Sequence, residues 1–228
     1  MNWISLLFGP DGWGGLMLEG AVVTIDAMGC QRNITKKIIA KKADYVIALK
    51  GNQGALHEDV KLLAAEQKTN GFKDVTISRH ETVDGDHGRI ETRSYTVFHN
   101  VEWLQERHDW PSLKGVVMVE SQREIEGKIS KETRFYITSL TLLANMIGPM
   151  IRDHWAIENR LHWVLDVTFR EDQSRLRKGF GARNMAVARH FALNLVRSAV
   201  DAKSLKLRRK RAAWASGYLN QILTAQVS

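Results

Sequence analysis

Hydrophobic and polar positions follow two different periods along the chain, and together they predict an α/β protein. Residues 21–25, AVVTI, are apolar and β-branched, which is typical of a strand buried on both faces. Residues 31–42 place isoleucines on one face of a helix and lysines mostly away from it. Residues 45–49 are a second strand of the buried type. This order predicts a βαβ unit with two parallel strands and a right-handed crossover.

The sequence pattern changes from helical to strand-like after a predicted amphipathic helix at residues 55–67. Four strand-like segments separated by turn signals then follow, at residues 75–77, 93–97, 115–119 and 133–137. This stretch, about residues 75–140, is either a β-rich insertion or a set of further strands of the same sheet. Residues 1–17 show no helix or strand period, so we expect an atypical leader there and one domain at residues 18–228.

A long helix is predicted from Pro149 towards Lys178, with Pro149 in its first turn. Four apolar side chains share one arc of it and predict a core-facing stripe: Met150, Ile157, Leu161 and Val164. Four further side chains lie beside that stripe: His154, Trp155, Glu158 and His162. A carboxylate at the edge of a buried face needs a partner, because an unpaired desolvated charge is costly. Glu158 is therefore a candidate to bind a cation, a metal or a polar ligand. Further helices are predicted at residues 183–200 and 218–223.

Composition narrows the class of protein without deciding it. The 228 residues are 44% hydrophobic and 25% charged, as in ordinary globular proteins. No apolar run is long enough to span a bilayer, and the N-terminus does not resemble a secretory signal. The single cysteine, Cys30, excludes an intrachain disulfide and a multi-cysteine zinc site. We therefore expect a cytoplasmic protein that does not enter a membrane.

Positive charge is concentrated in the C-terminal part of the chain. Residues 151–211 hold 15 Lys and Arg against 6 Asp and Glu, whereas the rest of the chain holds 18 against 19. A one-sided basic field favours a polyanion, most often nucleic acid, although a solvated basic surface is the alternative. The candidate phosphate contacts lie in residues 170–178 and 203–211: Arg170, Arg175, Arg177, Lys178, Lys206, Arg208, Arg209, Lys210 and Arg211.

Asp26 and Glu158 are the candidate metal ligands. Asp26 follows the first buried strand directly, and open α/β sheets bind ligands beyond the carboxyl ends of their parallel strands. A turn or helix-capping role is the alternative for Asp26. Two carboxylates favour a hard divalent cation such as Mg²⁺. A zinc site built from His154, Glu158 and His162 at i, i+4 and i+8 competes with this interpretation, as does a structural histidine pair.

Three separated blocks, at residues 20–31, 43–53 and 152–172, strongly resemble the H-repeat-associated insertion-sequence transposases. These are DDE transposases with a ribonuclease H-like fold. The resemblance implies a two-metal mechanism, with Mg²⁺ or Mn²⁺, in which water and then a DNA 3′-hydroxyl attack phosphodiesters. It implies DNA partners, the transposon ends and the target, with a homodimer as one option. It assigns the second catalytic Asp to Asp26 and the catalytic Glu to Glu158, and it puts His154 where relatives hold a phosphate-contacting Arg.

One departure from the family affects the expected activity. The family's first catalytic Asp lies on the first strand of the fold, well before the block that contains Asp26, and the leader offers only Asp11 in a turn. We therefore expect a ribonuclease H-like mixed sheet with a β-rich insertion that is incomplete at the N-terminus. Three functions stay open: a transposase, inactive if the first Asp is lost; a non-catalytic DNA-binding remnant; and a metal-dependent nuclease of the same fold.

Overall fold

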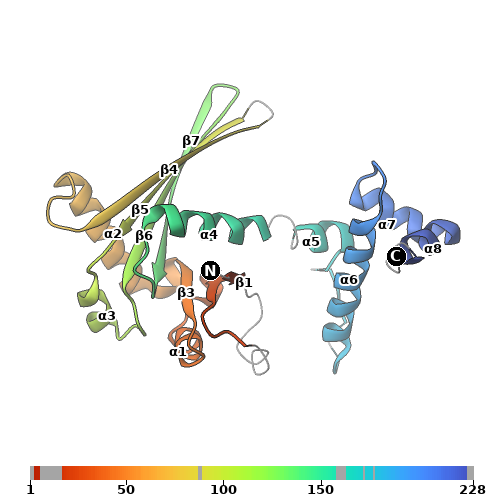
Figure 1. Cartoon of the computed structure of the whole chain (residues 1–228), viewed down its shortest axis with the longest axis horizontal. Coiled ribbons are helices and arrows are strands. Elements are labelled where there is room, and N and C mark those ends of the chain that lie inside the picture. Colours follow the sequence, from red (N-terminus) through yellow and green to blue (C-terminus); the bar gives the residue numbers. More distant parts are fainter. Residues whose placement is uncertain are drawn as a thin grey trace. The chain divides into compact units, whose positions relative to one another are not determined.

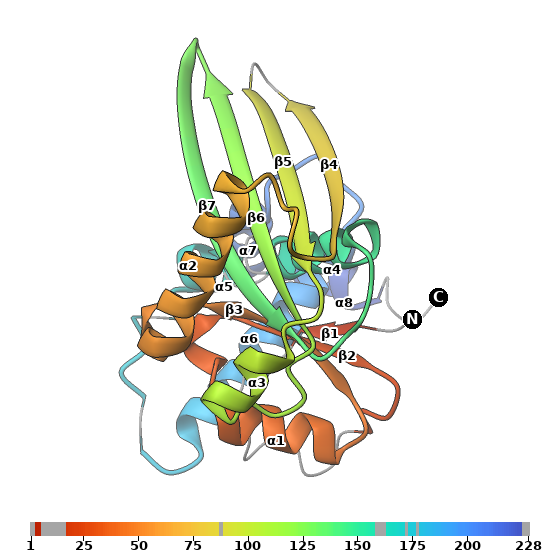
Figure 2. The ribbon, with the colours of Figure 1, turned by 90° about the vertical axis from the view of Figure 1, so that its left-hand side faces the viewer.

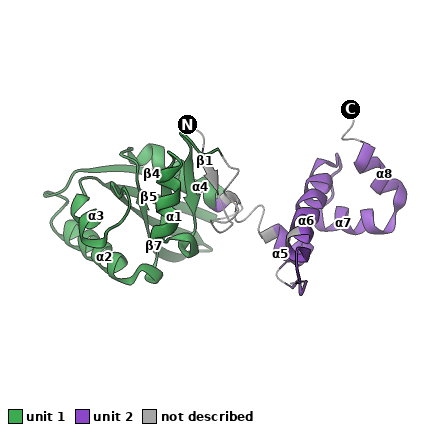
Figure 3. Cartoon of the chain, turned by 90° about the horizontal axis from the view of Figure 1, so that it is seen from below, with its two compact units in different colours: residues 1–154 green, residues 155–228 purple. Residues whose placement is uncertain are grey.

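The computed structural model describes residues 3–5, 17–86, 89–157, 163–171, 173–176 and 178–224. The chain divides into two compact units, Met1–His154 and Trp155–Ser228, which we call unit 1 and unit 2 (Figure 3). Unit 1 is built on a β-sheet, and the described part of unit 2 is helical. None of the described helices is long and apolar enough to cross a membrane.

A seven-stranded mixed sheet forms the centre of unit 1, within the described residues (Figure 1). The strands lie in the order β1-β2-β3-β7-β6-β5-β4; the first three are parallel to one another and the remaining pairs are antiparallel. Their bounds are β1 Trp3–Ser5, β2 Val22–Ile25, β3 Asp44–Leu49, β4 Ile77–Asp86, β5 Arg89–Phe98, β6 Gly115–Ile125 and β7 Lys128–Thr138.

The predicted βαβ unit is confirmed. Strands β2 and β3 pair in parallel with Ile25 opposite Ile47, and helix α1, Arg32–Ala40, connects them. Every residue of β2 is buried, as the continuous apolar run predicts for a strand with both faces covered. Because both strands run the same way, the residues that follow them, Asp26 and Lys50, leave the sheet at the same edge.

Helices cover both faces of the sheet. Figure 2 shows α2, Gly54–Thr69, and α3, Glu102–His108, on the near face and α4, Ala144–Ile157, on the far face. The near-face core joins apolar side chains of α1, α2 and α3 to alternate residues of the strands, among them Val23, Tyr45, Met118 and Ile137. Helix α3 was not predicted from the sequence.

Strands β4 to β7 continue the same sheet, which settles the question of whether these segments are further strands of it. They are longer than predicted, and their outer halves extend beyond the helices (Figure 2). The outer halves are mostly polar, and their apolar residues Val83, Ile90, Ile125 and Ile129 are exposed, so they lack the alternation by which a half-buried strand is recognised. Glu126 and Gly127 join β6 to β7 in a two-residue turn with φ values of 50° and 76°, as hairpin turns of type I′ require.

Two sequence expectations about secondary structure are wrong. Trp3–Ser5 in the leader forms strand β1, paired in parallel with β2. The helix expected from Pro149 to Lys178 begins earlier, at Ala144, so that Pro149 lies inside it, and it ends at Ile157 as described. The early start has a tertiary cause: the Ala144 N–H donates to Ser78 Oγ over 3.0 Å, which satisfies a free donor of the first turn.

Unit 2 contains four described helices: α5 Trp163–Phe169, α6 Gly181–Ser198, α7 Leu205–Trp214 and α8 Ser216–Thr224. The predicted helices at residues 183–200 and 218–223 are therefore confirmed as α6 and α8. Helix α5 ends at Phe169, because the next residue, Arg170, has a left-handed φ of 55° and cannot continue the helix. The described core of this unit is small and consists of four buried side chains: Val164, Leu165, Leu193 and Val196.

Candidate active site and nucleic-acid interface

Asp26 lies at the carboxyl end of β2 and is half-buried. Its Oδ1 accepts a hydrogen bond from the Gly29 N–H over 3.2 Å and so caps the 3₁₀ turn η2, Ala27–Gly29. The capping role considered for Asp26 is thus real, but it uses only one carboxylate oxygen. Among the residues that the structure describes, Oδ2 has no hydrogen-bond partner.

Two amide side chains from the loop after β3 hold the loop that carries Asp26. Asn52 Nδ2 donates to the Ala27 carbonyl over 2.6 Å, and Gln53 Nε2 donates to the Cys30 carbonyl over 2.8 Å. Both residues lie in the short 3₁₀ turn η3, Gly51–Gln53, which α2 follows directly. Sequence reasoning treated this segment only as a loop. The signal that could have found it is the pair of amides in the loop that follows β3, the strand parallel to β2.

Helix α4 is seated on the sheet by contacts along its length. Gly148 lies against the Tyr95 ring, where a Cβ would come within 3.3 Å of the ring carbons. Arg152 pairs with Asp84 of β4 at 2.9 Å. His154 is 4% exposed, and its Nδ1 lies 3.2 Å from Thr24 Oγ1 on β2. This burial favours a role for His154 in packing α4 on β2 over the phosphate contact that the resemblance implied.

An arginine and carboxylate cluster, which we call the ribbon cluster, lies on the α4 face of β4, β5 and β6. Glu91 accepts from Arg93 at 2.5 Å, from Arg123 at 3.5 Å and from Arg89. Arg93 also pairs with Asp84 at 2.5 Å. Burial alone would raise the pKa of Glu91, but the three guanidinium groups hold it below its usual value. The ribbon cluster therefore keeps Glu91 ionised.

Three predicted site residues lie outside the described residues: Glu158, His162 and Arg177. The meeting of Asp26 with Glu158 and the zinc set of His154, Glu158 and His162 therefore stay predictions. In the described part of the chain, no group of three His, Cys, Asp or Glu side chains could hold a metal ion.

The predicted basic residues of unit 2 fall into two kinds. Arg208 is a structural residue: its guanidinium donates to Asp201 Oδ1 at 2.7 Å and to the Val196 carbonyl at 3.0 Å, and its side chain is 13% exposed. Arg209 donates to the Thr168 carbonyl and stacks over the Phe169 ring at 5.3 Å. These two arginines join α7 to its neighbours, so less of their charge is offered to a ligand.

The other predicted DNA-binding residues that the structure describes are exposed and available to a polyanion: Arg170, Arg175, Lys178, Lys206, Lys210 and Arg211. On α7, Lys210 lies 5.9 Å from the Trp214 ring centre and Arg211 lies 4.6 Å from that of Tyr218. Ser204 caps the helix by accepting from the Leu207 N–H, so the basic segment is a defined helix and not a loose tail.

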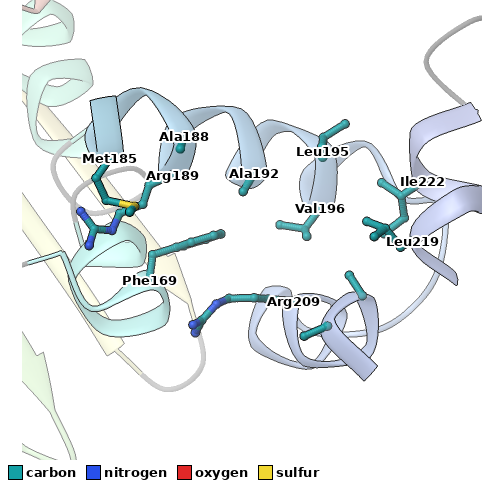
Figure 4. Close-up of a pocket in the computed structure, with 12 residues that line it drawn as sticks. Phe169, Met185, Ala188, Arg189, Ala192, Leu195, Val196, Arg209, Leu219 and Ile222 are labelled. Carbon is teal, nitrogen blue, oxygen red and sulfur yellow. The ribbon is translucent and has the colours of Figure 1, made fainter. Parts of the chain in front are cut away.

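A cavity of about 390 Å³ lies between α5, α6, α7 and α8 (Figure 4). The Phe169 ring points into it, and its described lining is apolar apart from Arg189 and Arg209. Arg189 pairs with Glu171 at 3.6 Å. The cavity reflects loose packing among these helices and offers no described carboxylate for catalysis.

Together, the mixed sheet, the helices on both of its faces and the carboxylate at the end of β2 define a ribonuclease H-like protein. A family model described as Transposase DDE domain matches residues 11–195. The chain belongs to this family.

Named relatives agree with the family. Putative transposase YncI of Escherichia coli O157:H7 is 39% identical over 217 residues, which are 92% of this chain and 54% of that protein. H repeat-associated putative transposase YhhI of Escherichia coli K12 is 35% identical over 223 residues, 94% of this chain and 57% of that protein. The resemblance to H-repeat-associated transposases is confirmed. The chain spans about half the length of these curated relatives.

Proposed function

We propose that this chain acts in insertion-sequence transposition, by metal-dependent cleavage of DNA and strand transfer. The observation that carries the proposal is the position of Asp26: it ends a buried parallel strand in a chain that belongs to the DDE transposase family. In this proposal Asp26 and Glu158 are both catalytic residues and metal ligands, and the partners are transposon ends and target DNA. The proposed site of action is the cytoplasm.

The donor chemistry at Asp26 fits a hard divalent cation. A carboxylate oxygen is the ligand that Mg²⁺ and Mn²⁺ prefer. Asp26 is half-buried, and its Oδ1 accepts a hydrogen bond from the Gly29 N–H. Its Oδ2 has no hydrogen-bond partner among the described residues and can bind a ligand. Bound Mg²⁺ or Mn²⁺ would supply Lewis-acid polarisation of a phosphodiester and stabilise charge on the attacking and leaving oxygens.

The chain's own residues would position the reactants. Asp26 would hold its ligand in an orientation set by η2, and the exposed basic side chains of unit 2 would bind the DNA backbone. The contact of His154 with Thr24 seats α4 on β2, the strand that Asp26 directly follows.

Cleavage and strand transfer on a supercoiled plasmid, with Mg²⁺ or Mn²⁺, test the proposal. We expect activity that is abolished by Asp26→Ala and by Glu158→Ala, because each change removes a metal-ligand oxygen pair. Asp74→Ala and Glu66→Ala, which remove exposed carboxylates elsewhere in unit 1, are the matched controls and should leave activity unchanged. Activity that survives both Asp26→Ala and Glu158→Ala would refute the proposed site.

Binding of DNA without cleavage is the second candidate function. The exposed cations of α7, held on a capped helix, favour it because they need no metal and no Asp26. If the wild-type chain binds DNA and cleaves none under any divalent ion, the non-catalytic function replaces the catalytic one. A third outcome, cleavage without strand transfer, would indicate a nuclease of the same fold.

A further inference from the structure

The loop that carries Asp26 is fixed from a second strand. Asn52 and Gln53 reach it from the loop after β3, 25 and 23 residues away from their acceptors in the chain. Their acceptors, the carbonyls of Ala27 and Cys30, bracket Gly29, whose N–H holds Asp26 Oδ1. The two amides therefore hold the Asp26 loop on both sides of its capping hydrogen bond.

These hydrogen bonds fix the position of η2 more than they stabilise the fold. Asn52 is exposed and Gln53 is half-buried, and a neutral hydrogen bond near solvent competes with water, so its net contribution to stability is small. What the two bonds do is remove freedom from a short turn. That turn ends β2 at the edge where open α/β sheets bind their ligands.

We propose that Asn52 and Gln53 are positioning residues for the Asp26 carboxylate. They fix η2 so that Oδ1 stays on the Gly29 N–H and Oδ2 is left for a divalent cation. The inference rests on the proposed function, because it takes Asp26 as a metal ligand. Groups that orient a ligand from outside the coordination sphere commonly change metal affinity by about 10–100-fold when they are removed.

Mn²⁺ titration of the full chain, followed by the electron paramagnetic resonance signal of free Mn²⁺, tests the inference. Asn52→Leu and Gln53→Met keep the side-chain size and remove the amide donors. We expect each to raise the half-saturating Mn²⁺ concentration by about 10-fold, and the double variant to raise it further. Asn33→Leu and Gln122→Met, which change exposed amides on α1 and β6, are matched controls and should bind as the wild type does.

Thermal unfolding of the same variants separates positioning from a purely structural role. A lowered unfolding midpoint with unchanged Mn²⁺ half-saturation would overturn the inference, as would wild-type binding in both single variants. If one variant fails to fold, the other decides, since each amide holds its own carbonyl. Wild-type Mn²⁺ binding that Asp26→Ala does not weaken would instead refute Asp26 as a metal ligand, and with it the proposed function.

Discussion

Gly29 is required by close packing and not by an unusual φ. A Cβ at this position would lie 2.2 Å from the Cγ2 atom of Ile25, a buried side chain of β2. No real Cβ tolerates such a contact, so any larger residue would push η2 away from the strand. Since the Gly29 N–H is the donor that holds Asp26 Oδ1, the displacement would reach the carboxylate directly.

We predict that Gly29→Ala destabilises the protein by about 2 kcal/mol, as overpacking of a well-packed site does. The free energy of unfolding, measured by urea denaturation, checks this. Gly85→Ala is the control: a Cβ at Gly85 meets nothing within 4 Å, so we expect a change of about 0.5 kcal/mol or less. Equal stability of the Gly29→Ala variant and the wild type would show that η2 shifts freely.

Asp201 lies in the connection between α6 and α7 and holds it to α8. Its carboxylate accepts from the Tyr218 hydroxyl at 2.7 Å, from the Lys203 N–H at 3.0 Å and from Arg208 Nε at 2.7 Å. The Tyr218 hydroxyl, with the Lys203 N–H and the Arg208 guanidinium, lowers the pKa of Asp201 from 3.8 to about 2, against an opposing effect of burial.

This lowered pKa predicts a loss of stability in acid. The folded-state pKa is below the unfolded-state value, so the stabilisation is complete above about pH 4 and is lost as the pH falls towards 2. We expect Asp201→Asn to flatten this part of the profile of thermal midpoint against pH. The midpoint is read by circular dichroism between pH 5 and pH 2, with Asp74→Asn as control. Parallel profiles for the wild type and the Asp201→Asn variant would rule out this role for Asp201.

At the scale of elements, the ribbon cluster explains how the outer part of the sheet keeps its shape without a core. The Glu91 side chain is 6% exposed and the Arg93 side chain 10%, and they are the buried pair of the cluster. Arg152 connects the cluster to α4 through Asp84. The seat of α4 therefore depends partly on charges that lie on β4 and β5.

We predict that Glu91→Gln destabilises the protein by about 2 kcal/mol, because it leaves the Arg93 guanidinium desolvated with a weaker partner. Glu132→Gln, on the outer half of β7 in the same sheet, is the matched control. Glu132 also accepts from an arginine, Arg134 at 2.7 Å, but it is 57% exposed, so its removal should cost little. Urea unfolding compares the two, and similar losses in both would contradict the special role of Glu91.

Helices and strands could be predicted from the sequence where their burial produces a clear pattern of apolar residues. The all-buried strands β2 and β3 and the helix between them were recognised, and so was their common edge with Asp26. The outer halves of β4 to β7 were not, because their buried positions include the charged residues Glu91 and Arg93, so burial there leaves no apolar period in the sequence. The start of α4 was missed because Ser78, 66 residues away, supplies the contact at its first turn.

The candidate site was predictable only in part, for a similar reason. A strand end marks Asp26, but the Asn52 and Gln53 contacts depend on how two loops meet in space. The basic segment of residues 203–211 was recognised by charge alone, and charge cannot tell Arg208, which pairs with Asp201, from Lys206 and Lys210, which face solvent.

For the whole molecule, the uneven charge predicts electrostatic binding of DNA by unit 2. Replacing Lys206, Lys210 and Arg211 by Gln should weaken binding and reduce the slope of log affinity against log salt by about 3, if each contacts a phosphate. Fluorescence anisotropy with a labelled duplex at several salt concentrations measures the slope. Gln at Lys36, Lys37 and Lys73, exposed in unit 1, is a control of equal charge. Equal effects of both triple variants would point to net charge alone.

The tight turn at Glu126 and Gly127 limits how the hairpin it closes can vary in length. Ile125 and Lys128 are directly paired, so the turn has no slack. Because neighbouring side chains on a strand point to opposite faces, one added residue would exchange the two faces of β7 relative to β6. In homologous chains this hairpin should therefore lengthen or shorten by whole cross-strand pairs. The hairpin then changes in length, while each residue of β6 and β7 stays on the same face of the sheet.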